Sequence, residues 1–385
     1  MTVVYKDRRN TDCEKWDGLK SQFGRDDLLA AWVADMDFEA PECIKTAMQK
    51  YVDFNVYGYY AEPEAYKNAF IKWEKNYQQY DVCREWIRFI PGVVPAIYWL
   101  VQTWAAEGDG VIVMPPVYYP FLNSIKETGR RLVTCPLKEA EGRYSFDLEL
   151  FEEKIITENA KVFILCNPHN PVGRVWSEDE LRSVLDICKA HGVYVISDEI
   201  HQDIIMPGYV KTTAANTGDY DDILVTLTSA SKSFNIAGFQ NAFAIIPDEE
   251  NRATFDEIIK RVHLSEGGTP GYIAVQAAYE DGREWLNEVI EIIADNYRTL
   301  KSSLERNLPA ARVFPLEGTY LVWIDLTACA RDKNVEETML SECRIACEFG
   351  EWFGGEEYKN YIRINLAISK ENVTEIARRI ACCYN

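Results

Sequence analysis

Short apolar runs in the first two thirds of the chain are typical of buried strands. A stretch with apolar residues at helical spacing, Glu178–His191, separates the second run from the third. Strand, helix and strand in this order predict an α/β fold: a mainly parallel central sheet covered by helices on both faces. The predicted strands are Val111–Met114, Lys161–Cys166, Val193–Ser197, Ile223–Thr228 and Ala242–Ile246.

The pattern changes after about residue 275. Two helical stretches, Gly271–Glu280 and Arg283–Asn307, precede a strand at Thr319–Leu326, a helix with charged faces, a second strand at Tyr361–Ala367 and a final helix. This order indicates a smaller α+β domain joined to the sheet by the long helix. We therefore predict a large domain over residues 46–280 and a small domain made of residues 1–45 and 281–385, with the N-terminal segment packed on the latter.

Composition narrows the functional classes. The 385 residues carry a formal net charge of -20, which disfavours binding to nucleic acid or to anionic membranes. The first twenty residues are charged and lack an apolar core, and no apolar run is long enough to cross a bilayer. Eleven cysteines and four histidines show no zinc spacing, so we expect free thiols, no metal site and a cytoplasmic location.

A lysine between small hydroxyl residues, Lys232 in Thr228–Asn235, directly follows a predicted strand. An isolated lysine is usually a solvated surface charge. At the carboxyl end of a buried strand, however, ligands bind and a lysine amine with a lowered pKa forms imines with aldehydes. The neighbouring serines are small donors suited to a phosphate.

Three further motifs follow strands or open helices. Asp198 ends a strand, where a carboxylate needs a cation such as a pyridinium nitrogen, although it could also cap the next turn. The segment 166–173 contains Asn170 between two prolines, which either aims an amide at a ligand or only starts a helix. Gly92 precedes a predicted helix whose N-terminus could hold a phosphate; most such turns bind nothing.

Together these motifs resemble the fold-type-I enzymes that use pyridoxal 5′-phosphate (PLP), the class I/II aminotransferase superfamily, and most closely its MalY/PatB cystathionine β-lyase branch. The matching segments span nearly the whole chain. They are Val33–Phe38, Tyr57–Tyr59, Pro91–Val94, Pro116–Tyr118, Pro168–Trp176, Ser197–His201, Ser231–Gly238, Glu317–Tyr320 and Ile362–Asn365.

The resemblance implies roles for residues around the cofactor ring. Lys232 would form the internal aldimine and later move the Cα proton of the substrate. Asp198 would pair with the pyridine nitrogen, and Asn170 and His201 would hydrogen-bond the ring hydroxyl oxygen. Tyr118 would stack on the ring.

It also implies where phosphate and substrate bind. Arg363 would clamp the substrate α-carboxylate, with Ala34 and Tyr118 beside it. Tyr59 would reach the phosphate of a neighbouring subunit, so a homodimer is expected. The other residues expected at the phosphate are Gly92, Val93, Val94, Ser229 and Ser231.

The expected reaction is the action of a C–S β-lyase on an S-linked amino acid, giving pyruvate, ammonia and a thiol. An aminotransferase is the alternative, because both reactions use the same residues around the ring. Gln240 stands where many aminotransferases have a phosphate-binding arginine, which favours the lyase. Glu351 and Trp352 are expected near Arg363, where they would affect the choice of substrate. A non-catalytic regulator of this fold is disfavoured because Lys232 is present and no basic patch is found.

Overall fold

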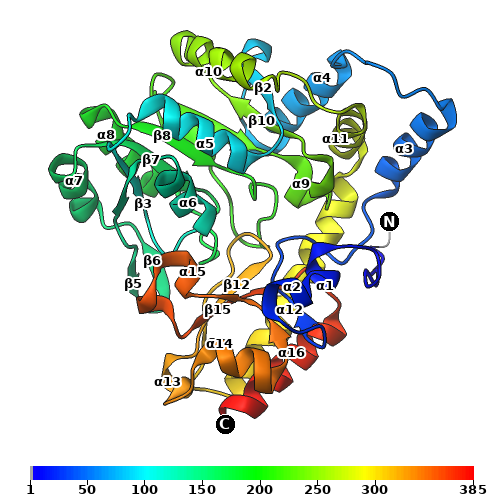
Figure 1. The fold of residues 1–385 in the computed structure, drawn as a ribbon, viewed down its shortest axis with the longest axis vertical. Coiled ribbons are helices and arrows are strands. Elements are labelled where there is room, and N and C mark those ends of the chain that lie inside the picture. Colours follow the sequence, from blue (N-terminus) through cyan, green and yellow to red (C-terminus); the bar gives the residue numbers. More distant parts are fainter. Residues whose placement is uncertain (1–2) are drawn as a thin grey trace.

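The computed structural model describes residues 3–385 and contains a central seven-stranded sheet (Figure 1). Its strand order is β2-β10-β9-β8-β7-β3-β4, and only β10 runs antiparallel to its neighbours. The mainly parallel sheet is thereby confirmed. The strands are β2 (Ile87–Ile90), β3 (Gly110–Val113), β4 (Arg131–Thr134), β7 (Ala160–Cys166), β8 (Tyr194–Asp198), β9 (Leu224–Thr228) and β10 (Ala242–Ile245).

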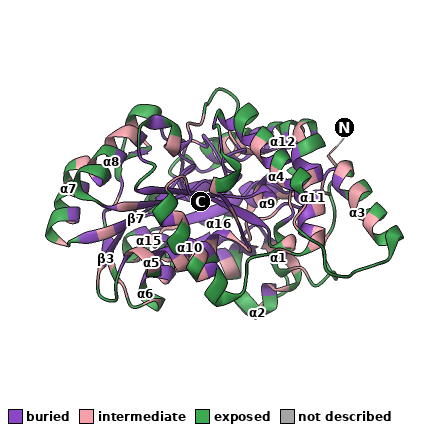
Figure 2. Ribbon diagram, turned by 90° about the horizontal axis from the view of Figure 1, so that it is seen from above, coloured by how far each residue is buried: buried purple, intermediate pink, exposed green. Residues whose placement is uncertain are grey.

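Helices cover both faces of this sheet because alternate strand side chains point into two separate cores. Val162 and Ile164 of β7 face the core under α5, α6 and α10, whereas Phe163 and Leu165 face the core under α7 and α8. Figure 2 shows the buried sheet between helices whose outer surfaces are exposed. The helices are α5 (Val93–Trp104), α6 (Tyr119–Glu127), α7 (Leu148–Thr157), α8 (Glu178–His191) and α10 (Glu249–Val262).

A smaller antiparallel sheet lies beyond the long helix α12 (Arg283–Asn307) and below the central sheet in Figure 1. Its order is β11-β12-β15-β14, and α12 and α16 share its apolar core. The elements are β11 (Arg312–Val313), β12 (Leu321–Asp325), α13 (Thr327–Ala330), α14 (Val335–Thr338), the π-helix η5 (Met339–Cys343), β14 (Glu348–Phe349), α15 (Glu351–Gly354), β15 (Tyr361–Asn365) and α16 (Lys370–Tyr384).

The N-terminal segment joins this smaller region. Strand β1 (Leu29–Ala30) pairs in parallel with β13 (Ile345–Ala346), and the backbone amide of Val3 donates to Glu288 of α12. The other elements near the N-terminus and at the edges are α1 (Glu14–Asp17), α2 (Leu19–Phe23), α3 (Glu42–Phe54), α4 (Glu64–Trp73), the π-helix η1 (Glu74–Gln78), α9 (Ala230–Ser233), α11 (Thr269–Asp281) and the hairpin β5 (Lys138–Ala140) with β6 (Arg143–Ser145).

The predicted elements agree with the observed ones to within two residues at each end. One difference concerns the charged helix expected between β12 and β15. That stretch forms three short helices, α13, α14 and η5, instead of one. Within residues 3–385, no helix combines the length and the apolarity required to span a membrane. The domain boundaries at residues 45/46 and 280/281 stay a prediction.

Candidate active site

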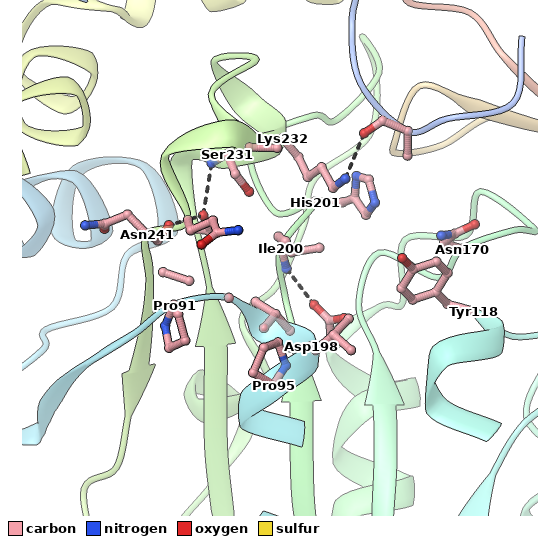
Figure 3. Close-up of a pocket in the computed structure, with 18 of the residues that line it drawn as sticks. Pro91, Pro95, Tyr118, Asn170, Asp198, Ile200, His201, Ser231, Lys232 and Asn241 are labelled. Carbon is pink, nitrogen blue, oxygen red and sulfur yellow. Dashed lines mark hydrogen bonds between the residues drawn. The ribbon is translucent and has the colours of Figure 1, made fainter. Parts of the chain in front are cut away.

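The carboxyl ends of five parallel strands meet at one edge of the central sheet, and a cavity lies there. Strand β10 runs the opposite way, so its amino end, preceded by Gln240 and Asn241, reaches the same edge. Figure 3 shows the side chains converging from these strand ends. The lining residues used below are Ala34, Gly92, Val93, Val94, Tyr118, Cys166, Asn170, Asp198, His201, Ser229, Ser231, Lys232, Gln240 and Asn241.

Lys232 lies on α9, the short helix after β9, and its amine extends into the cavity (Figure 3). Nζ donates a 2.7 Å hydrogen bond to the carbonyl of Ala34, which also accepts 2.8 Å from the Tyr320 hydroxyl. Burial lowers the pKa of the amine, and the nearby Arg363 lowers it further. A lysine in this state is unprotonated more often than a surface lysine, so more of it is available as a nucleophile or general base.

Asp198 ends β8 deep in the cavity. Its Oδ1 accepts 3.0 Å from the Ile200 amide, so the carboxylate does cap the following turn, whereas its pairing with a pyridine nitrogen stays a prediction. The cap is too weak to offset desolvation, since burial raises the pKa of Asp198 to about 7. A cationic partner would stabilise this carboxyl as an anion, and residues 3–385 supply none at hydrogen-bond distance.

Neutral groups surround this carboxyl. Burial lowers the pKa of His201 well below its ordinary value, so the imidazole is uncharged, and its Nδ1 has no partner among the described residues. Burial raises the pKa of the Cys166 thiol, which accepts 3.4 Å from the Asn170 amide. Burial also raises the pKa of Tyr118, so its phenol stays protonated.

The opposite end of the cavity is built for an anion. Gly92 is the N-cap of the twelve-residue α5. The amides of Val93 and Val94 in the first turn have no intrahelical acceptor, and Pro95 has no amide hydrogen. The Ser229 hydroxyl is less available than expected, because it donates 2.7 Å to the Asn241 carbonyl while accepting 3.0 Å from the Ser231 amide.

Arg363, on β15, is buried next to the cavity rather than in its lining. Nη1 donates 3.0 Å to Asn170 Oδ1, and Asn170 does line the cavity. Nη2 donates 3.0 Å to the Trp32 carbonyl and lies 2.5 Å from a carboxylate oxygen of Glu348. The guanidinium is therefore held in place from both domains of the predicted division.

Three predicted residues lie outside this arrangement. Tyr59 is fully exposed and is not part of the cavity of this single chain. Glu351 is exposed at the start of α15. Trp352 packs edge-on against Tyr119 and Phe349 instead of lining the cavity.

Sequence reasoning missed Glu348 and gave Tyr320 no role. Glu348 lies on a two-residue strand that no periodicity marks, and only its position opposite Arg363 in the β14–β15 pair gives it meaning. The sequence could have indicated a role for Tyr320, because an aromatic hydroxyl directly before a buried strand needs a polar partner.

The fold and the cavity define the class of this protein. A family model described as aminotransferase class I and II matches residues 33–380, so the chain belongs to that family.

Individual relatives are similar over nearly the whole chain. Cystathionine β-lyase PatB of Bacillus subtilis (strain 168) is 38% identical over 378 residues, covering 97% of each chain. A PLP-bound putative aminotransferase from Clostridium difficile 630 superposes with a TM-score of 0.96 at 35% identity, covering 99% of each chain. Cystalysin from Treponema denticola, described as containing PLP, has a TM-score of 0.94 at 36% identity and covers 100% of this chain and 99% of its own.

Proposed function

We propose that this protein is a C–S β-lyase that uses PLP to convert an S-linked amino acid and one water molecule into a thiol, pyruvate and ammonia. The observation that carries the proposal is one cavity in which a half-buried lysine, a buried carboxyl and a free helix N-terminus converge. The likeness of the whole chain to PatB and cystalysin supports the lyase reaction in particular.

PLP is the cofactor, and the donor set of the cavity fits it. The free amides of Val93 and Val94 and the Ser231 hydroxyl would hold the phosphate. Asp198 would accept a hydrogen bond from the ring nitrogen, which supplies the positive charge that this carboxyl lacks. The unpartnered Nδ1 of His201 and the amide of Asn170 would serve the ring hydroxyl, and Tyr118 would cover the ring face.

When bound, PLP links covalently to an amine and accepts the electrons of a carbanion at the substrate Cα. Lys232 would provide the resting attachment, because burial keeps a share of its amine uncharged. Released from that attachment, the same amine would take the Cα proton as a general base. The Ala34 carbonyl accepts from this amine at one edge of the cavity, and the Tyr320 hydroxyl donates to the same carbonyl.

Binding of the α-carboxylate is assigned to Arg363. Its guanidinium hydrogen-bonds Asn170, which lines the cavity. Among residues 3–385, no other guanidinium hydrogen-bonds a side chain of the lining. A planar guanidinium suits a carboxylate, and two parallel N–H bonds would fix the Cα–H bond relative to Lys232.

The test separates elimination from amino transfer. A panel of cysteine S-conjugates, including small and cationic ones, should yield pyruvate and thiol in the absence of any 2-oxo acid. The alternative is an aminotransferase, which the likeness to the Clostridium difficile protein supports. An aminotransferase would turn over only when a 2-oxo acid is added. Amino transfer without acceptor-independent pyruvate from any conjugate would overturn the lyase assignment.

A homodimer is part of the proposal. Exposed apolar and aromatic side chains cluster at the end of α3 and in the loop after it, which supports a contact surface. Tyr59 would there reach the phosphate of the second subunit. Sedimentation of the loaded enzyme should give twice the chain mass, and Tyr59→Phe should weaken cofactor retention without changing that mass. The clustered residues are Val52, Phe54, Val56, Tyr57, Tyr59 and Tyr60.

A further inference from the structure

Glu348 and Arg363 form a fully buried ion pair beside the candidate site. They lie directly opposite each other in the antiparallel β14–β15 pair, with 2.5 Å between Oε2 and Nη2 and side-chain exposures of 6% and 1%. Oε2 has no hydrogen-bond partner of good geometry in the described part of the chain. The carboxylate is thus held mainly by charge, although burial favours its neutral form.

This pair leaves the guanidinium without a free edge. A carboxylate binds a guanidinium best through two parallel N–H bonds, along either the Nη1–Nη2 or the Nε–Nη2 edge. Both edges include Nη2, which already contacts the Trp32 carbonyl and Glu348. Nε, by contrast, is buried and has no acceptor in the described chain. A second carboxylate can therefore bind in the bidentate mode only if one of these two contacts of Nη2 is broken, and the contact with Glu348 is the one that a competing carboxylate would replace.

We propose that Glu348 is a specificity residue: an internal anion that holds Arg363 in the empty site and is displaced by the substrate α-carboxylate with uptake of one proton. The inference rests on the carboxylate-binding role of Arg363 in the proposed function. If Glu348 must be displaced, the affinity of the site for a carboxylate depends on Glu348 as well as on Arg363.

The charge balance explains the proton. Before binding, Arg363 and Glu348 sum to zero; a substrate carboxylate would leave one uncompensated buried negative charge. Protonation of Glu348 restores neutrality. The proton comes from solvent, Glu348 becomes the neutral acid, and the guanidinium of Arg363 then pairs with the substrate carboxylate. The other charged or titratable groups that face Glu348 come from three helices and from its own segment. They are Tyr118 and Tyr119 at the start of α6, Lys232 on α9, Glu14 on α1 and the neighbouring residue Cys347.

Propanoate, a carboxylate without an amine, and its uncharged amide propanamide are suitable probes of the PLP-loaded enzyme. Calorimetric titration in two buffers of different ionisation heat should show about one proton taken up per propanoate bound near pH 8, and affinity that falls as pH rises. Glu348→Gln should remove most of this uptake. It should also tighten propanoate binding about tenfold at this pH, the equivalent of recovering one charge-assisted hydrogen bond. Propanamide should bind equally weakly to both enzymes.

Control variants distinguish the possible failures. Glu351→Gln removes a nearby but exposed carboxylate and should leave propanoate binding unchanged. Unchanged or weaker propanoate binding in Glu348→Gln, or undiminished proton uptake, would mean that Glu348 only orients Arg363, and would overturn the proposal. If that variant does not fold, absence of proton uptake in the unmodified enzyme overturns it equally. Arg363→Ala should abolish propanoate binding; normal binding would refute the clamp, whereas the lyase assignment stands or falls separately on pyruvate release.

Discussion

Asp198 should destabilise the cofactor-free enzyme, and the size of this effect follows from its burial. The pKa of its carboxyl rises from 3.8 to about 7 in the folded protein. The folded state therefore binds the proton more tightly than the unfolded state. The contribution of this carboxyl to the free energy of unfolding is fully present below pH 3.8 and decreases as pH rises. This decrease is complete just above about pH 7. About three pKa units correspond to about 4 kcal/mol.

Asp198→Asn removes this pH dependence while its side-chain oxygen can still accept the hydrogen bond from Ile200. Between about pH 5.5 and pH 8, the variant should gain about 2 kcal/mol relative to the unmodified protein, since only the upper part of the titration lies in that window. With an unfolding entropy of roughly 2.1 cal/mol/K per residue over 385 residues, this is a relative shift in Tm of about 2 to 3 °C.

The assay is thermal unfolding of both cofactor-free proteins across that pH range, repeated with PLP. Added PLP should reverse the order, because only Asp198 can pair ionically with the ring nitrogen. Parallel Tm curves for the two cofactor-free proteins would refute the reasoning, because they would show that Asp198 ionises without penalty and serves only as a cap.

Three other substitutions test the site. Lys232→Ala should fold normally, yet borohydride should no longer fix PLP covalently to the chain, as peptide mapping would show; label on any other lysine of the unmodified enzyme would exclude the assignment. Arg363→Ala should raise KM about a hundredfold for every amino acid tested, the expected loss of one bidentate charged contact, whereas an effect confined to kcat would contradict a binding role. Glu351→Ala should leave the ranking of S-conjugates unchanged, because its side chain is exposed; a changed ranking by kcat/KM would place it in the pocket.

The fold could be predicted where burial leaves a simple trace in the sequence. Strand β7 is apolar almost throughout and buried on both faces, so its pattern is visible without tertiary information. Strand β4 was missed because it lies at the sheet edge, and only Val133 among its four residues is fully buried. Strand β2 was missed as well: it has four residues, and Arg88 interrupts its apolar run.

The residues of the candidate site also fall into those that local sequence reveals and those that it does not. Asp198 is the last residue of its strand, and Lys232 and Asn170 each lie four residues beyond the end of theirs, so local sequence places all three at one edge of the sheet. Glu348 could not be found like this, because its role depends on the cross-strand pairing with Arg363. The expectation for Glu351 assumed that its side chain turns toward Arg363, whereas the first turn of α15 presents it to solvent.

The two buried acids of the site share one physical feature. Burial raises the pKa of both Asp198 and Glu348, so each carboxyl is less stable as an anion than a surface acid would be. For Asp198, the missing cation would be a ring nitrogen that arrives with the cofactor. For Glu348 the cation is already present, and the substrate would take it away. The same desolvation would therefore act at two places: at Asp198 it would favour binding of the cofactor, and beside the cavity it would lower the free energy needed to replace the internal carboxylate of Glu348 by that of the substrate.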